Sequence, residues 1–369
     1  MKILICSLLK RKITPKITAA RPRVIFDLIS GLNKKGHKIT VLGTKNSKIP
    51  GVKIISVIPK SFVEMPNYEN PFYAETGFLT KMAKIIEKIG NQFDIIHNHT
   101  YPEFINLLIA SKIKTPIITT IHAQITPELD EVLSLFPETK LIAISKAAKK
   151  LAKKAKIYKV IYNGVDTSLY RFCPKKENYL LWLGRLGGAK NKKGKFIDAK
   201  GVRWAIKLAR ETNSKLLLSG NVEDVEFYNK DVKPYLSNKI KWLKGVSPEQ
   251  PLTKKQVAKL MATARAFLMT INWNEPFGLV MAEAMSCGTP VIAFRRGSVP
   301  ELVKNGKTGY IVNPKEGIDG LKKALLKIDK INPKDCREHI EKNFSLEKMI
   351  NNYEQTYKDL IAKSKAQRK

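Results

Sequence analysis

The chain has 369 residues, of which 43% are hydrophobic and 27% charged, as expected for a globular protein large enough to form two domains. A total of 67 Lys and Arg against 32 Asp and Glu gives a formal charge of +35, which attracts polyanions without choosing among nucleic acid, membrane and phosphorylated substrate. The sequence has no run of about 18 apolar residues, which excludes a membrane-spanning helix. Four scattered cysteines without metal-ligand spacing favour a reduced, cytoplasmic compartment.

The first half of the chain alternates short apolar runs with amphipathic segments. Strands are expected at residues 2–8, 38–42, 53–57, 94–97, 117–121 and 141–144, and helices at 22–35, 77–89 and 145–157. This alternation predicts an α/β domain with a doubly wound parallel sheet, in which ligands bind at the carboxyl ends of the strands. The residues that follow those strands are therefore the candidates for a site.

Three histidines lie at such strand ends. His97 and His99 end the strand expected at 94–97, and a His-x-His pair is a possible metal ligand set. The sequence offers no apparent third ligand, and we expect the two rings to face opposite ways, so no metal site is predicted. His122 follows the strand at 117–121 and is either a hydrogen-bonded structural histidine or a site residue.

The second half is most informative where two glutamates flank the start of a helix. A strand is expected at 266–271, a helix at 279–286 and a second strand at 291–294. The N–H groups of Phe277, Gly278 and Leu279 lie at the positive end of that helix and can bind a phosphate. Glu275 precedes the helix, and Glu283 lies about 5–8 Å along it at roughly 1.5 Å per residue. A sugar, a diphosphate and a ribose would fit in that order.

The full string, Glu275-Pro-Phe-Gly-Leu, Glu283-Ala-Met and Gly288-Thr-Pro-Val, resembles the donor-binding signature of retaining glycosyltransferases of family 4. These enzymes have the GT-B fold, in which two Rossmann-like, doubly wound parallel-sheet domains face a cleft. The resemblance implies that Glu275 contacts the donor sugar and Glu283 the ribose. It also implies that His122 supports the reacting sugar from the opposite domain, so that His122 and Glu275 are the catalytic residues.

Further residues match the family's phosphate-binding positions. Gly184-Arg185-Leu186 matches the family's Gly-Arg-Leu, and Lys200-Gly201 matches its Lys-Gly pair, so the resemblance places Arg185 and Lys200 on the donor phosphates. The loop between them is longer here than usual, which makes Lys193-Gly194 a rival. In the loop after the first strand, Ala19-Ala20 replaces the family's Gly-Gly near the diphosphate. Alanine disfavours a positive φ, so a looser donor contact is expected there.

The domain boundary follows from the same resemblance. Tyr162-Asn-Gly-Val-Asp matches the family's interdomain segment, which predicts an acceptor-side domain at 1–165 and a donor-binding domain at 166–345. A final helix at 346–369 matches the family helix that packs back on the N-terminal domain.

The resemblance implies a retaining, metal-independent glycosyltransferase that moves a hexosyl unit from a nucleotide diphosphate sugar to a hydroxyl of a glycan or lipid-linked acceptor. The nucleotide sugar is a substrate, so no cofactor is implied, and nucleic acid is not an expected partner. Two alternatives stay open: a nucleotide-sugar 2-epimerase, and a non-catalytic basic protein that binds membrane or nucleic acid. The charge and the basic helices at 77–89 and 145–157 favour peripheral contact with the anionic inner face of a membrane.

Overall fold

The chain forms two compact units. The computed structural model describes residues 1–65, 68–243 and 252–366. One unit comprises Met1–Gly164 together with the segment that starts at Leu346, and the other comprises Val165–Ser345. The boundary lies one residue before the position derived from the sequence, and the C-terminal helix belongs to the first unit.

The first unit is built on a seven-stranded sheet in the order β3-β2-β1-β4-β5-β6-β7, with neighbouring strands parallel. The strands are β1 (Lys2–Cys6), β2 (Lys38–Thr44), β3 (Lys53–Ile58), β4 (Ile95–Asn98), β5 (Ile117–Ile121), β6 (Lys140–Ala143) and β7 (Ile157–Val160). The α-helices are α1 (Ala20–Lys34), α2 (Pro71–Ile89), α3 (Pro127–Ser134), α4 (Lys146–Leu151) and α12 (Leu346–Ala366). The order reverses between β1 and β4, which makes their carboxyl ends the switch point where ligands bind in such sheets.

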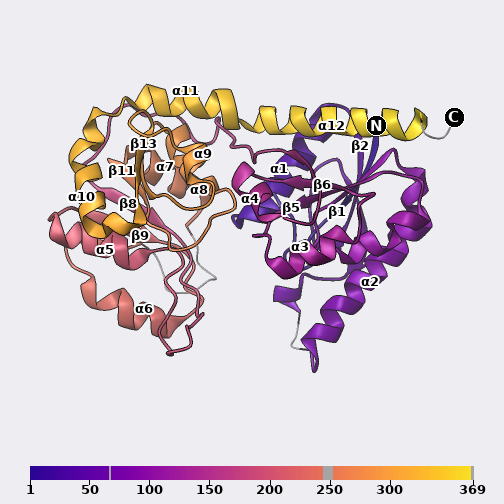
Figure 1. Cartoon of the computed structure of the whole chain (residues 1–369), viewed down its shortest axis with the longest axis horizontal. Coiled ribbons are helices and arrows are strands. Elements are labelled where there is room, and N and C mark those ends of the chain that lie inside the picture. Colours follow the sequence, from indigo (N-terminus) through magenta and orange to yellow (C-terminus); the bar gives the residue numbers. More distant parts are fainter. Residues whose placement is uncertain (66–67, 244–251, 367–369) are drawn as a thin grey trace. The chain divides into compact units, whose positions relative to one another are not determined.

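The helix α12 is held close to α1, as Figure 1 shows, because α1 has a glycine where the two helices meet. A Cβ atom on Gly31 would lie 2.0 Å from Cδ1 of Ile350, so a larger residue would separate the helices. The side chains of Tyr353 and Tyr357 on α12 are then completely buried in the first unit. This packing explains why the final segment of the chain folds with the first.

Two expected helices have different limits in the structure. The helix expected at 77–89 begins at Pro71, because the Asn70 side chain caps it by accepting a hydrogen bond from Tyr73 N–H. The helix expected at 145–157 ends at Leu151. The Asp130 carboxylate accepts hydrogen bonds from the backbone N–H groups of residues 153–155, and these bonds hold the chain out of the helix.

The second unit has a six-stranded parallel sheet in the order β10-β9-β8-β11-β12-β13. The strands are β8 (Leu180–Leu183), β9 (Leu216–Ser219), β10 (Ile240–Trp242), β11 (Ala266–Met269), β12 (Val291–Phe294) and β13 (Gly309–Val312). The α-helices are α5 (Val202–Glu211), α6 (Val225–Asp231), α7 (Lys254–Thr263), α8 (Leu279–Ser286), α9 (Val299–Leu302), α10 (Gly317–Lys327) and α11 (Pro333–Phe344). The order reverses between β8 and β11.

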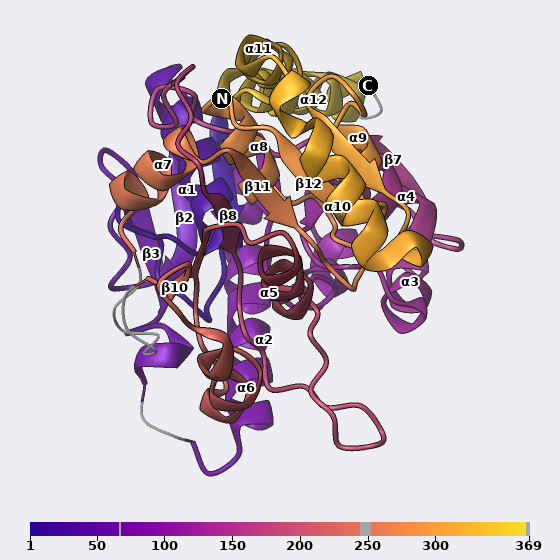
Figure 2. The same cartoon turned by 90° about the vertical axis from the view of Figure 1, so that its left-hand side faces the viewer.

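Helices cover both faces of this sheet. Figure 2 shows α5 and α10 together in front of it, and α8 packs with α7 and α11 on the other side. The residues of β9, β11 and β12 are all buried because both faces are covered, and these strands accordingly have continuous apolar sequences. Both units are thus Rossmann-like α/β domains, as the sequence predicted. No helix in the described ranges is long and apolar enough to cross a membrane.

Candidate functional site

The switch point of the second unit brings together a lysine and a glutamate that are distant in the sequence. Lys200 precedes α5 and Glu275 follows β11, and Nζ of Lys200 lies 2.6 Å from Oε2 of Glu275. Their side chains are 23% and 13% exposed, so the ion pair is largely shielded from water. The indole of Trp273 completes the cluster, because its Nε1–H donates to the same carboxylate oxygen at 3.0 Å. The Lys200 ammonium lies 4.5 Å from the centre of the indole ring.

Backbone contacts place Lys200 there. The Thr270 hydroxyl donates to the carbonyl of Gly201 at 2.7 Å, and the Asn272 N–H donates to the carbonyl of Ala199 at 2.9 Å. Gly201 has a φ of +73°, and a Cβ atom on it would lie 1.6 Å from the Thr270 carbonyl oxygen. Only glycine allows this approach. Lys193, the rival candidate, lies instead among the exposed residues between Lys190 and Phe196, which form an antiparallel bridge.

The start of α8 is also shaped by glycine. Gly278 precedes the helix with a φ of +84°, and a Cβ atom on it would lie 2.4 Å from Cε of Met281. The Ser298 hydroxyl, just before α9, donates to the Phe277 carbonyl at 2.6 Å and so holds the turn that precedes α8. Leu279 is the first helical residue, and the helix has no side-chain cap. The positive end of α8 is therefore held beside Glu275, where an anion would be stabilised.

The other two predicted donor residues are Glu283, within α8, and Arg185, just after β8. Glu283 is half-buried on α8. Arg185 follows β8, is 61% exposed and pairs with Glu223 at 3.2 Å. That carboxylate is held at the same end of the sheet, because Glu223 N–H donates to the carbonyl of Leu186. The Arg185 guanidinium is thus a surface cation near the switch point, whereas Lys200 is enclosed.

The first unit places His122, which is half-buried, in a polar cluster at the ends of β4 and β5. Nε2 of His122 lies 2.9 Å from Nδ1 of His99. Arg21, in the first turn of α1, pairs with Glu103 at 3.0 Å, and the glutamate side chain is 1% exposed. Oε2 of Glu103 and Nε2 of His99 are buried without a hydrogen-bond partner. Buried polar atoms of this kind usually have a partner, which marks this cluster as a place for water or a ligand.

The histidines of this cluster stay neutral. Burial, and then the positive charge of Arg21, lower the pKa of His99 to about 3. Burial lowers the pKa of His122 well below its usual value, and Arg21 and His99 lower it further. His122 can therefore donate or accept a hydrogen bond near neutral pH, but it does not supply a positive charge there.

Two expectations for this region were wrong. The rings of His97 and His99 do not face opposite ways: their centres are 3.8 Å apart, because residues two apart in a strand share a face. The Ala19-Ala20 pair needs no positive φ in this structure. Ala19 is extended, with a φ of −64°, and Ala20 begins α1, so alanine carries no backbone strain at either position.

Four cluster residues were absent from the sequence-derived site: Arg21, His99, Glu103 and Trp273. The sequence did signal His99, through its strand-end position, although we considered it only as a metal ligand. Arg21 and Glu103, which are 82 residues apart, meet only through the fold of the first unit. In the second unit Trp273 lies two residues from Glu275, and only Lys200 reaches it from a distant part of the sequence. In the described parts of the chain, no group of three or more His, Cys, Asp or Glu side chains is arranged to hold a metal ion.

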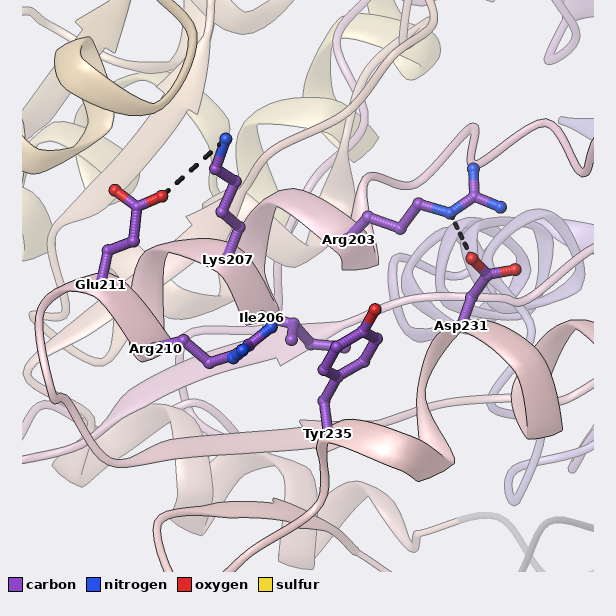
Figure 3. Close-up of a pocket in the computed structure, with 7 residues that line it drawn as sticks. All are labelled: Arg203, Ile206, Lys207, Arg210, Glu211, Asp231 and Tyr235. Atoms are coloured by element: carbon purple, nitrogen blue, oxygen red, sulfur yellow. Dashed lines mark hydrogen bonds and ion pairs between the residues drawn. The ribbon is translucent and has the colours of Figure 1, made fainter.

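A separate cavity of about 500 Å³ lies along α5 (Figure 3). Its charges are largely paired within the protein: Arg203 with Asp231 at 2.8 Å, and Lys207 with Glu211 at 3.8 Å. Arg210 lies 5.0 Å from the ring centre of Tyr235. Because the acidic partners offset most of the basic charge, this cavity is less suited to an anionic ligand than the cluster of Lys200, Glu275 and Trp273.

Comparisons with known proteins agree with the fold. The model "Glycosyl transferases group 1" matches residues 172–345, and the model "Glycosyltransferase Family 4" matches residues 22–169. One family model thus matches each unit, and the two units together form the GT-B fold of these enzymes. The chain belongs to the group 1, family 4 glycosyltransferases.

Relatives and solved structures match almost the whole chain. N-acetyl-α-D-glucosaminyl L-malate synthase of Bacillus anthracis is 25% identical, over 90% of this chain and 92% of the relative. Sucrose-phosphate synthase of Thermosynechococcus elongatus has a TM-score of 0.77 at 17% identity, covering 98% of this chain and 99% of that one. Anabaena Alr3699/HepE, solved with UDP-glucose, has a TM-score of 0.69 at 17% identity, covering 97% and 100%. These structural matches support the fold.

The buried histidines predict a loss of stability in mild acid. A histidine whose pKa is lower in the folded state binds fewer protons there, so its contribution to stability is present above about pH 6.5 and is lost as pH falls. We expect the free energy of unfolding of the protein to fall between pH 7 and pH 5.5, as measured by guanidinium titration. His99→Gln should flatten this dependence by up to about 1.4 kcal/mol per pH unit. An unchanged slope in the variant would contradict the buried, neutral state of His99.

Proposed function

We propose that this glycosyltransferase moves a hexosyl unit from a nucleotide diphosphate sugar to an acceptor hydroxyl, with retention of configuration and without a metal ion. The observation that carries the proposal is the Lys200–Glu275 pair beside the positive end of α8, at the switch point of the second sheet. One cation, one helix end and one carboxylate match a donor that has a diphosphate next to a sugar. The relative named N-acetyl-α-D-glucosaminyl L-malate synthase and the structure solved with UDP-glucose support this donor class.

Each residue has a role in this proposal. Arg185, Lys200 and the N–H groups at the start of α8 stabilise the negative charge on the leaving diphosphate. Glu275 accepts hydrogen bonds from sugar hydroxyls, and Glu283 accepts them from the ribose. His122, neutral because it is buried beside Arg21, hydrogen-bonds the reacting sugar without adding a cation.

The proposed reaction breaks the bond between the anomeric carbon and the diphosphate oxygen. The acceptor oxygen forms the new bond on the same face, and its proton passes to the departing phosphate oxygen. Retention follows because attack and departure occur on one face. The positive groups around the diphosphate lower the barrier because they stabilise charge that develops as the bond breaks.

A thermal-stability screen of nucleotide sugars tests the donor class. A donor at 100 times its dissociation constant stabilises the folded protein by about 2.7 kcal/mol, so its melting temperature should rise. The donor found in this way is then incubated with and without candidate acceptors. Transfer only when an acceptor is present supports the proposal. Conversion of the sugar without an acceptor would indicate the 2-epimerase instead, and a bound but unreacted donor would indicate a non-catalytic protein.

We also propose that the first unit contacts an anionic, cytoplasmic membrane face through the start of α2. Phe72 and Tyr73 are 71% and 72% exposed there, and Lys81, Lys84 and Lys88 lie exposed further along the same helix. Aromatic side chains beside lysines suit the interfacial region of a bilayer. Such contact would bring the enzyme to a lipid-linked acceptor.

Glu283→Ala should weaken the binding of the nucleoside diphosphate released from the selected donor. The substitution removes a charge-assisted hydrogen bond to the ribose, which contributes about 1.5–3 kcal/mol. Isothermal titration calorimetry measures the change, with Glu226→Ala on α6 as the control carboxylate. Equal affinity in the Glu283 variant and the control would remove Glu283 from the site.

Arg185→Ala should reduce kcat at least tenfold, since the guanidinium acts on the leaving diphosphate. The matched control is Arg210→Ala, an arginine of the same unit that lies on Tyr235 in the separate cavity. Initial rates at saturating donor give kcat for both variants, with and without EDTA. A kcat within about threefold of the parent would contradict the role of Arg185, and loss of activity in EDTA would contradict the metal-free mechanism.

The protein should sediment with vesicles that contain anionic lipid and stay in solution with neutral vesicles. Each Lys or Arg near an anionic surface contributes about 1 kcal/mol, and screening at physiological salt acts beyond about 8 Å, so binding should weaken at high salt. Replacing both Phe72 and Tyr73 by Ser should weaken binding further. Leu326→Ser, at an 82% exposed position in the second unit, is the control. Equal recovery in the supernatant with both lipids would contradict the membrane contact.

A further inference from the structure

The proposed donor mechanism uses Lys200 and Glu275 but does not use the tryptophan that contacts both. Trp273 presents two different surfaces to them. The face of its ring holds the Lys200 ammonium at 4.5 Å, and its edge donates the Nε1 hydrogen bond to Glu275 at 3.0 Å. A cation on an aromatic face and an anion at an indole N–H are both favourable, so one side chain orients both charges.

We propose that Trp273 is a positioning residue for the donor, and that the Lys200–Glu275 ion pair is a closed state of the site which the donor opens. This inference rests on the proposed function, since it assigns the diphosphate to Lys200 and the sugar to Glu275. When the donor enters, its phosphate oxygens replace Glu275 as the partner of Lys200. The sugar hydroxyls replace Lys200 as the partner of Glu275. Trp273 keeps its contact with each side chain throughout.

The loop around Trp273 is anchored, so the indole has a fixed place from which to act. The Asn272 side chain donates to the carbonyl of Asp198 at 2.8 Å, and the Asn274 side chain accepts from Gly297 N–H at 3.3 Å. The residues on either side of Trp273 are thus tied to two different parts of the second unit. These anchors hold the backbone of Trp273 in place, and this favours its contacts with Lys200 and Glu275.

The closed state has a consequence for ligand selection. A nucleoside diphosphate without a sugar takes Lys200 from Glu275 and offers that carboxylate, 13% exposed, no hydroxyl in return. The complete donor supplies both partners. Breaking the Lys200–Glu275 ion pair costs free energy, and only the nucleotide sugar gives both side chains a new partner. The site should therefore bind the substrate in preference to the nucleoside diphosphate product.

Two substitutions separate the contacts of Trp273. Trp273→Phe keeps an aromatic face for Lys200 but removes the N–H donor to Glu275. Trp273→Leu removes both. The matched control is Trp242→Phe, at an indole on β10 of the same unit that packs against the ring of Tyr228.

Calorimetry measures the dissociation constants of each nucleoside diphosphate (UDP, ADP or GDP) and of the matching nucleotide sugar, such as UDP-glucose. For the pair that binds the parent protein, Trp273→Phe should weaken the nucleotide sugar about tenfold and the nucleoside diphosphate less than twofold. Trp273→Leu should weaken both, and Trp242→Phe neither. With kcat measured alongside, the Phe variant should raise KM for the donor more than it lowers kcat. Equal weakening of both ligands by Trp273→Phe, or weakening of neither, would overturn the proposal.

A measurement without ligand keeps the inference distinct from the proposed function. The indole ¹⁵N–¹H resonance that Trp273→Phe removes should shift in Glu275→Gln and in Lys200→Met, because both change its surroundings. A resonance unmoved by both variants would overturn the positioning role even if donors bind. If the resonance shifts but none of these nucleotide sugars binds the parent protein, the donor assignment of the proposed function fails and the selection by Trp273 fails with it.

Discussion

The contact between the turn before α5 and the end of β11 is the constraint on which the donor-side cluster depends. Gly201 packs directly against the backbone of Thr270, and the Thr270 hydroxyl closes the contact with a hydrogen bond. Lys200 follows a long loop and has a flexible side chain, so its ordering costs conformational entropy. The backbone contact and the neighbouring Trp273 limit that cost. As a result, the Lys200 ammonium lies 2.6 Å from the Glu275 carboxylate, so a charged ligand must compete with an ion pair that already exists.

The two units use ionisable groups in different ways. In the second unit the side chains of Lys200 and Glu275 form an ion pair that is partly shielded from water. In the first unit, burial and Arg21 keep His99 and His122 neutral, so their hydrogen bonds do not depend on protonation near neutral pH.

The net charge of +35 acts mainly outside the site. Acidic residues are the minority, and several serve more than one cation: Glu211 pairs with Lys207 and Lys322, and Glu354 with Lys35 and Lys358. Exposed pairs of this kind contribute little to stability. The unpaired lysines that remain at the surface bear on association with anionic partners, whereas the site is defined by a few side chains with fixed neighbours.

The sequence by itself determined the fold class and the approximate boundary, and it predicted the residues proposed to bind the donor, because these inferences depend on local signals. Apolar runs mark the buried strands, glycine marks the positive-φ turn at Gly278, and the string from Glu275 to Glu283 lies on one continuous strand–turn–helix segment. Only the tertiary structure shows that Lys200, and not Lys193, lies beside Glu275, since a crossover between β8 and β11 forms this contact. It also decided the roles of Trp273, Arg21 and Glu103. Arg21 and Glu103 are far apart in the sequence, and Lys200 reaches Trp273 from another loop, although Glu275 is a local partner of Trp273. Hydrogen-bond distances and burial follow from packing that no local pattern encodes. The pKa values of the histidines are likewise decided only by the tertiary structure, because desolvation depends on everything that surrounds a ring after the chain has folded.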